Sequence, residues 1–175
     1  MPVATATAAA RDADRCLLVT VGGGRFAVPT RTVLAVSELP PVSALPFSPP
    51  WLRGLARAAG GVVAVIDLAR LLTLGSSPDA LPARAASDEE GVRETMIVVR
   101  ASDAELDAGL AVRGIARLVT LSGMPGRPLA TGELDAWRTV LIAGLVPDPT
   151  GADRSPVAVL DVDRLLRDAR RELDA

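Results

Sequence analysis

The sequence predicts an all-β fold made of two small barrels that an internal repeat relates to each other. About ten short apolar runs, separated by glycine, proline and polar residues, are typical of such a fold. The segment VVAVIDLARLL from Val62 returns as VAVLDVDRLL from Val157, and three shorter segments also recur in the same order. The matched positions are Leu17 with Met96, Phe26 with Leu110, Leu52 with Ile142, and Asp67 with Asp161, at offsets of 79, 84, 90 and 94 residues. Slowly growing offsets indicate two related halves whose loops differ in length.

The first half begins with strands on either side of a glycine turn. Residues 1–14 are small and polar, and we expect them to form a flexible tail. Strands are predicted at residues 16–21, 25–29 and 33–39. The GGG turn joins the first two, because glycine accepts positive φ without a side-chain clash. The proline-rich residues 40–50 exclude a central strand and predict an irregular crossing, followed by a short turn or helix at residues 51–54.

The first half closes with a buried strand and a short helix. The apolar run predicts a strand at residues 62–66, and Asp67 starts a helix that carries three leucines on one side. Gly75 is placed to end this helix. Residues 76–93 contain prolines and an acidic cluster, and they predict the linker that separates the two copies.

The second half repeats this order and adds a longer helix. Strands are predicted at residues 95–100, 106–112, 115–121, 140–146 and 157–160. In the final helix, apolar residues recur every three or four positions, at Val162, Leu165, Leu166, Ala169 and Leu173. This stripe indicates docking onto the protein's own barrel, with a partner-binding helix as the alternative. We therefore expect one domain over residues 15–175, with a first lobe at about 25–75, the linker, a second lobe at about 94–161 and a helix at about 162–174.

Composition and charge exclude several classes of protein. The net charge of −2, with two Phe, two Trp and no Tyr, disfavours nucleic acid as a partner, because there is no excess of positive charge and little to stack on bases. No apolar run approaches the roughly 20 residues that span a bilayer, and the start lacks the apolar core of a signal peptide. We therefore expect a cytoplasmic protein that does not span a membrane. The single cysteine, Cys16, excludes an internal disulfide and predicts a buried inert thiol, with a reactive thiol as the alternative.

The residue types that are missing limit the chemistry further. The chain contains no His, Lys, Tyr, Asn or Gln. This removes the usual neutral-pH base, the Schiff-base amine, nitrogen metal ligands and most side-chain oxyanion donors. We expect no enzymatic activity, no cofactor and no metal site. The purely arginine-based set of cations reflects either coding bias or function.

The duplicated aspartates, Asp67 and Asp161, raise the alternative of an aspartic protease, in which two lobes bring two carboxylates together. That family needs Asp-Thr/Ser-Gly on a tight loop, whereas the residues that follow here are Leu-Ala and Val-Asp. Each aspartate instead stands where a helix starts, where its carboxylate can accept hydrogen bonds from free backbone N–H groups. Both are therefore predicted to be structural helix caps.

The segment PPWLRGLARAAGGVVAVIDLARLL, residues 49–72, resembles the CheW-like adaptor domain of bacterial chemosensory systems. The residues that match the order of the family are Pro49, Trp51, Gly54, Leu55, Gly60, Val65, Asp67 and Leu68. Upstream, VLAVSEL resembles the family's Val-x-Glu-aliphatic strand, and LPFSPP resembles its proline-rich entry. Downstream, the matching positions are Gly109, Leu110, Val112, Ile115, Leu118, Gly144 and Asp161. The resemblance covers about residues 16–166 and implies two SH3-like five-stranded barrels packed on each other.

The resemblance implies scaffolding rather than catalysis. A CheW adaptor bridges the cytoplasmic tip of a chemoreceptor and the regulatory domain of the histidine kinase CheA, which is itself CheW-like. For this chain it implies recruitment from the cytoplasm to membrane-associated receptor arrays, and contacts with other CheW-like domains. The receptor-facing role falls on Val36 and Glu38. Their alternatives are a core position for Val36 and a solvated strand charge for Glu38.

Several positions depart from the family pattern. The chain has Arg57 where the family has Asn, Ala59 where it has an arginine associated with partner contacts, Ala64 for a proline and Arg113 for an aspartate. Arg53 and Arg57 lie close enough in sequence to replace the lost charge, so both join Ala59 as candidate partner-binding positions. Gly54, Gly60, Asp67, Gly144 and Asp161 keep the framework and are assigned structural roles. These departures predict a divergent adaptor. The alternative is one that binds the kinase or another CheW-like domain without a receptor, for example in pilus motility.

Overall fold

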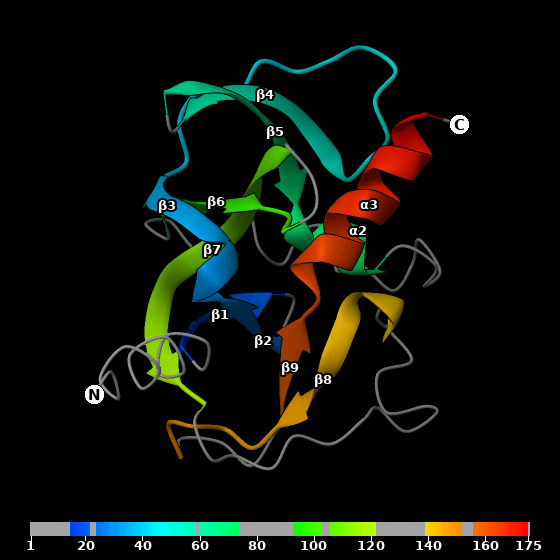
Figure 1. The fold of residues 1–175 in the computed structure, drawn as a ribbon. Coiled ribbons are helices and arrows are strands. Elements are labelled where there is room, and N and C mark those ends of the chain that lie inside the picture. Colours follow the sequence, from blue (N-terminus) through cyan, green and yellow to red (C-terminus); the bar gives the residue numbers. More distant parts are fainter. Residues whose placement is uncertain are drawn as a thin grey trace, which may run out of the picture.

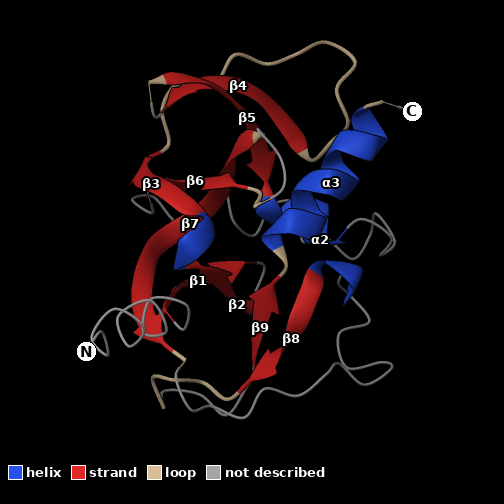
Figure 2. Cartoon of the chain, in the orientation of Figure 1, coloured by secondary structure: helices blue, strands red, loops and turns tan. Residues whose placement is uncertain are grey.

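The structure, a computed structural model, describes residues 15–21, 24–58, 60–73, 93–102, 106–121, 139–151 and 156–174. The described strands are β1 (Arg15–Val21), β2 (Gly24–Pro29), β3 (Val33–Glu38), β4 (Leu52–Ala58), β5 (Gly61–Asp67), β6 (Glu94–Arg100), β7 (Asp107–Thr120), β8 (Ile142–Val146) and β9 (Val157–Leu160). The helices are η1 (Thr30–Thr32), α2 (Leu68–Thr73), η3 (Thr139–Leu141) and α3 (Val162–Leu173). The fold is mostly β, as predicted (Figures 1 and 2).

Two sequence predictions of secondary structure are wrong. Of the turn or helix expected at residues 51–54, only Trp51 lies in a turn, whereas residues 52–54 start β4, whose buried positions alternate with more exposed ones. The two strands expected between residues 106 and 121 are one strand, β7, which is 14 residues long. Several other predictions lie outside the described residues: the tail at 1–14, Gly22 and Gly23 of the turn, Gly75, and the linker up to residue 92.

The long strand β7 joins two groups of five strands. Its first half pairs with β6 on one side and with β5 on the other, and β4 and β3 complete this upper group. Its second half pairs with β1, and the order then continues through β2 and β9 to β8. Figure 1 shows these groups as the upper and lower parts of the molecule. A bridge between Ser43 and Leu55 links the chain after β3 to β4, which closes the upper group into a ring.

Each group combines strands from both halves of the sequence. The repeated strands β5 and β9 end the two copies, and each pairs in parallel with a strand of the other copy. β5 pairs with β7, and β9 pairs with β2. The predicted lobe limits, about 25–75 and 94–161, therefore cut across the hydrogen-bonded groups, because the first copy contributes β1 and β2 to the lower group and β3, β4 and β5 to the upper group. That each group is an SH3-like barrel stays a prediction.

The buried residues among those that the structure describes form three clusters, and the largest lies between the two groups. The interior of the upper group contains Ala56, Val63, Val65, Met96, Val98 and Ala111. The interior of the lower group contains Cys16, Leu18, Ala27, Val119, Val146 and Val157. The third cluster has 26 buried residues, drawn from both groups and from both α-helices, and includes Phe26 and Trp51. The main core is therefore the packing of one group on the other.

These clusters test the sequence repeat. Phe26 and Leu110, at offset 84, share the large cluster, as do Leu52 and Ile142 at offset 90. The offset of 79 is wrong, because Leu17 faces the large cluster whereas Met96 faces the interior of the upper group. A slip of one residue turns a strand side chain to the opposite face, so only an even offset relates β1 to β6.

The helix α3 docks on its own chain through the predicted stripe. Val162, Leu165, Leu166 and Ala169 are buried in the large cluster, whereas Leu173 is half-exposed. The buried Trp51 donates a hydrogen bond from Nε1 to Glu172 Oε2 at 2.8 Å, which ties the end of the helix to the start of β4. The stripe is therefore part of the core. No helix of the described residues is long and apolar enough to cross a membrane.

The two repeated aspartates have equivalent contacts with the helices that follow them. Asp67 Oδ1 accepts a hydrogen bond from Arg70 N at 3.1 Å, and Asp161 Oδ1 accepts one from Arg164 N at 3.0 Å. Asp67 makes an additional contact, because its Oδ2 accepts hydrogen bonds from Arg53 Nε and Nη2 at 3.0 and 2.8 Å. Asp161 forms no ion pair with any described residue. The two copies of the motif therefore differ: both aspartates cap a helix, and Asp67 also binds an arginine of β4.

Gly54 stands where the chain crosses β4 most closely. Its φ is +137°, and a Cβ atom at this position would lie 2.0 Å from the carbonyl oxygen of Ser43. We expect Gly54→Ala to lower the free energy of unfolding by more than about 2 kcal/mol, because it adds backbone strain and breaks the Ser43 bridge. Chemical denaturation measures the loss. Gly61→Ala is the matched control, because nothing lies within 4 Å of its added carbon; equal effects of the two variants would contradict this account.

Replacing the two aspartates should have unequal effects. Asp161→Ala removes a helix cap and should cost about 1 kcal/mol. Asp67→Ala also removes an acceptor from Arg53, so we expect a further loss of about 1–3 kcal/mol. Denaturant unfolding of both variants, with Arg53→Ala as a third, measures the difference. When Arg53 is already replaced by alanine, Asp67→Ala should cost no more than the loss of a helix cap. If Asp67→Ala in the otherwise wild-type protein destabilises it only as much as Asp161→Ala does, the additional role of Asp67 is refuted.

Candidate partner-binding surfaces

The edge strand β3 carries the residues to which the family resemblance assigns the receptor. β3 pairs with β6 at one end of the sheet path. Val36 lies on its surface with 46% of its area exposed, and Leu34 is exposed to a similar extent. The structure therefore excludes the core alternative for Val36. Ala35, between these two residues, packs against the interior of the upper group. The strand thus presents Leu34 and Val36 to solvent, while Ala35 between them packs inward.

Glu38, the last residue of β3, forms an ion pair on the surface. Its Oε2 accepts a hydrogen bond from Arg93 Nη1 at 3.1 Å. Both side chains are exposed, Glu38 by 64% and Arg93 by 81%. Glu38 is therefore neither buried nor fully solvated. The sequence analysis placed Arg93 at the end of the linker and gave it no role, because only the pairing of β3 with β6, in which Glu38 is opposite Thr95, brings Arg93 near Glu38.

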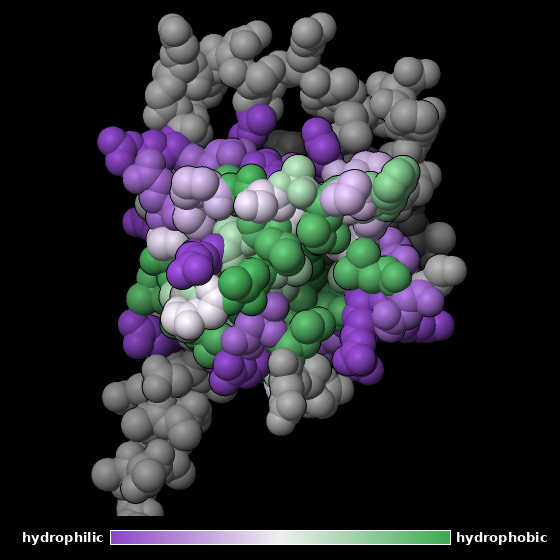
Figure 3. Space-filling view, turned by 90° about the horizontal axis from the view of Figure 1, so that it is seen from above, coloured by the Kyte–Doolittle hydropathy of each residue, from purple (hydrophilic) through white to green (hydrophobic). Residues whose placement is uncertain are grey.

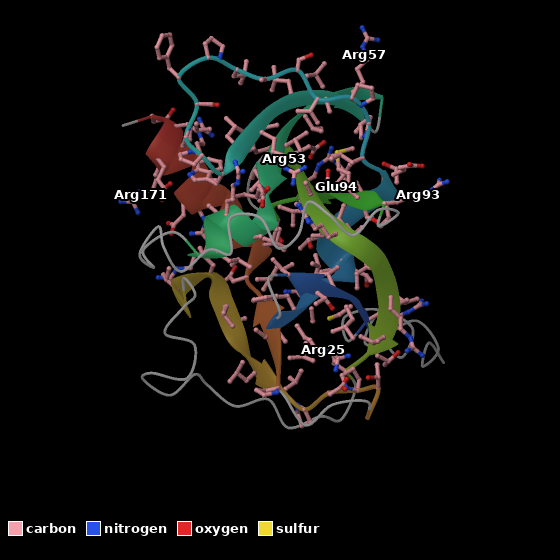
Figure 4. All side chains as sticks on the ribbon, turned by 180° about the vertical axis from the view of Figure 1, so that it is seen from behind. Arg25, Arg53, Arg57, Arg93, Glu94 and Arg171 are labelled. Carbon is pink, nitrogen blue, oxygen red and sulfur yellow. The ribbon has the colours of Figure 1, made fainter. Side chains whose placement is uncertain are left out.

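Arg53 lies in an internal network of charges instead of pointing freely into solvent. Besides Asp67, its guanidinium donates hydrogen bonds to both carboxylate oxygens of Glu94, at 2.8 and 2.9 Å. The hydrogen bonds with Glu94, together with the charge of Asp67, raise the pKa of Arg53 further above its usual value despite partial burial. Figure 4 shows Arg53 and Glu94 side by side at the centre of this face. Arg53 thus joins β4, β5 and β6, and its partner-binding role stays a prediction.

The hairpin of β4 and β5 places Arg57 on the outside. Arg57 is opposite Val62 in the strand pairing, and both are exposed. Figure 4 shows Arg57 extending from the end of the hairpin, away from Arg53. Gly60, in the turn, has a φ of +81°, which favours glycine. Ala59 lies outside the described residues, so the position of the family arginine has no structural description. Of the two replacement arginines, Arg57 is the accessible one.

An apolar surface covers the end of the upper group. Figure 3 shows apolar side chains gathered on this face and surrounded by hydrophilic ones. The crossing segment and the β4–β5 hairpin lie at this end of the molecule in Figure 1, and their large exposed apolar residues are Leu45, Phe47 and Val62. Phe47 is fully exposed and has a φ of +59°, which is unusual for a bulky residue. We name this surface, defined by Leu45, Phe47 and Val62, the end face. Sequence analysis did not identify Phe47, because it interpreted the surrounding residues 40–50 only as a proline-rich irregular crossing.

A cavity lies beside the lower group and the start of α3. It measures about 300 Å³ and lies among β1, β2, β8, β9 and the start of α3. Asp161 and Asp163 line it, but the first caps α3 and the second accepts a hydrogen bond from Ser102 N. Cys16 also lines it and is buried, as expected. Within the described ranges no three acidic, cysteine or histidine residues cluster so as to hold a metal ion.

Gly144, assigned a structural role, occupies the equivalent of Gly54. Both glycines stand at an irregularity in the pairing of their strands, opposite Val159 and Val65 respectively. Of these two glycines, only Gly54 has a positive φ. The two copies therefore keep the same irregularity, with the tighter crossing at Gly54.

Comparisons with known proteins agree with this architecture. The family model of the CheW-like domain matches residues 15–170. The crystal structure of the scaffolding protein TtCheW from Thermoanaerobacter tengcongensis is similar, with a TM-score of 0.63 and 16% sequence identity over 87% of this chain and 86% of that chain. The comparison with curated proteins finds no match. Because the family model covers most of the sequence, this chain belongs to the CheW-like domain family of chemotaxis scaffolding proteins.

Proposed function

We propose that this protein couples chemoreceptors to a CheA-type histidine kinase as a scaffold and catalyses no reaction. The observation that carries the proposal is the presence of two different exposed surfaces on one hydrogen-bonded group of strands. The edge of β3 offers Val36 beside the charged Glu38, and the end face offers Phe47 and Val62. Contiguous exposed apolar patches are typical of interaction sites. A scaffold with two such surfaces raises the effective concentration of one partner near the other.

The β3 edge is the proposed site for the cytoplasmic tip of a receptor, and the end face is the proposed site for the kinase regulatory domain or another CheW-like domain. Arg57 lies next to Val62 and offers a positive charge there. It is the proposed substitute for the arginine that Ala59 replaces. The net charge of −2 gives no support for nucleic acid as a partner. We propose that the protein acts in the cytoplasm and is recruited to receptor arrays at the membrane.

A second candidate function is an adaptor that binds the kinase or another CheW-like domain without a receptor. The departure at Ala59 favours it, because the family associates the missing arginine with partner contacts. Calorimetric titration of the protein with a CheA regulatory domain and then with a receptor tip from the same organism separates the two candidates. Binding to both supports the coupling scaffold. Binding to the kinase alone supports the second candidate, and binding to neither refutes both.

Substitution of Glu38 tests the receptor-facing strand. We expect Glu38→Arg to weaken binding of the receptor tip by about 1–2 kcal/mol, because it reverses the charge of an interface position. The melting temperature should hardly change, because Glu38 is exposed and surface ion pairs contribute little. Asp174→Arg, at the exposed end of α3, makes the same change in net charge elsewhere. Equal loss of binding in both variants, or a large loss of stability in Glu38→Arg, would contradict the assignment.

Substitution of Phe47 tests the end face. Because an exposed aromatic side chain that becomes buried often dominates an interface, Phe47→Ser should weaken binding of the kinase regulatory domain by about 2 kcal/mol or more. Binding of the receptor tip should stay within about twofold of wild type, since Phe47 lies on the end face and not on β3. Leu118→Ser, at a half-exposed position of β7, is the control for loss of surface hydrophobicity. Unchanged kinase binding in Phe47→Ser would remove the end face from the proposal.

A further inference from the structure

A chain of charged residues crosses the strands next to the proposed receptor site. Asp67 of β5 binds Arg53 of β4, and Arg53 binds Glu94 at the start of β6. Arg93 directly precedes Glu94 and binds Glu38 of β3. The inner residues are partly buried, whereas Glu38 and Arg93 are the most exposed members. The accessible end of this chain is therefore an ion pair that contains a proposed receptor-binding carboxylate.

The backbone holds Arg93 close to Glu38. The amide of Leu39 donates a hydrogen bond to the carbonyl oxygen of Glu94 at 2.9 Å, so β3 and β6 remain joined just beyond Glu38. Glu38 is opposite Thr95 in the strand pairing, which brings Arg93 alongside it. The pairing of β3 with β6 thus fixes the backbone positions of Glu38 and Arg93 relative to each other.

Two neighbouring charges, Arg53 and Glu94, are paired with each other. Both carboxylate oxygens of Glu94 accept hydrogen bonds from Arg53, so Glu94 is occupied by another cation. Arg53 in turn binds Asp67 through two of its nitrogens and cannot reach out to Glu38 at the same time. Among the described ion pairs, the partner of Glu38 is therefore Arg93.

We propose that Arg93 is an internal competitor for Glu38 that sets the affinity and selectivity of the β3 edge. This inference rests on the proposed receptor role of β3. A cationic side chain of the receptor reaches the Glu38 carboxylate only by displacing Arg93. A partner that lacks a suitably placed cation gains nothing from Glu38 and meets a neutral pair. Arg93 therefore reduces binding of weakly matched basic surfaces, which is a form of selection against wrong partners.

The test is the affinity of Arg93→Gln for a chemoreceptor cytoplasmic tip fragment, measured by calorimetry. Glutamine keeps much of the length of the side chain and removes its charge. Exposed ion pairs contribute about 0.2–1 kcal/mol, so we expect binding about 1.5 to five times tighter than wild type at low salt. At an ionic strength of 1 M the gain should disappear, because charges are then screened within about 3 Å.

Two control variants make the result specific. Arg100 lies at the far end of β6 from Arg93 and pairs with Asp107 of β7. Arg100→Gln removes this exposed charge and should leave receptor binding unchanged. In a Glu38→Gln background, Arg93→Gln should give no gain, because the competed carboxylate is absent. Thermal melting of each variant confirms that the fold is intact.

The outcomes separate this inference from the proposed function. Tighter binding that depends on Glu38 and on low salt supports the competitor role. Unchanged or weaker binding by Arg93→Gln, with wild-type protein binding the tip, refutes the competitor role and leaves the coupling function standing. If wild-type protein and variant both fail to bind the tip, the receptor role of β3 is refuted and this inference with it.

Discussion

The packing of the two strand groups on each other is the constraint on which the rest of the structure depends. Among the described residues, the interior of each group contains six buried side chains, whereas small single cores give little stability on their own. The cluster between the groups has 26, among them Trp51, Phe26 and the leucines of α2 and α3. Since each large buried apolar side chain contributes about 1.5–3 kcal/mol, most of the stabilisation lies at this junction. A change there affects both groups at once.

The exchange of strands between the copies reinforces this coupling. The first copy contributes β3, β4 and β5 to the upper group and β1 and β2 to the lower group, while β5 and β9 each pair with a strand of the other copy. Neither copy can therefore form its group alone, and β7 runs through both. A scaffold benefits from such a body, because partners bound at different surfaces keep a fixed relation to each other. The β3 edge and the end face both belong to the upper group, on either side of the bridge between Ser43 and Leu55.

Charge serves a different purpose in each part of the proposed binding region. Arg53 is held by Asp67 and Glu94 and joins three strands, so its charge is used within the protein. Arg57 extends from the hairpin and remains accessible. The sequence could not tell which of the two arginines is accessible, since they are four residues apart and both lie on β4. What separates them is the carboxylate at the start of β6, which comes from the other half of the chain.

The sequence by itself determined the β class, the existence of the repeat, the helix-starting aspartates and the membership of a family. These depend on local patterns: alternation of apolar residues, turn residues, and a carboxylate before a helix. It also identified Val36 and Glu38 as candidates, through resemblance. Only the tertiary structure decided that the copies exchange strands, that Arg53 faces inward to two carboxylates, that Arg93 meets Glu38, and that Phe47 is exposed. The physical reason is that these contacts join residues distant in sequence, and strand register, which local patterns specify only to within a residue or two, decides which side chains meet.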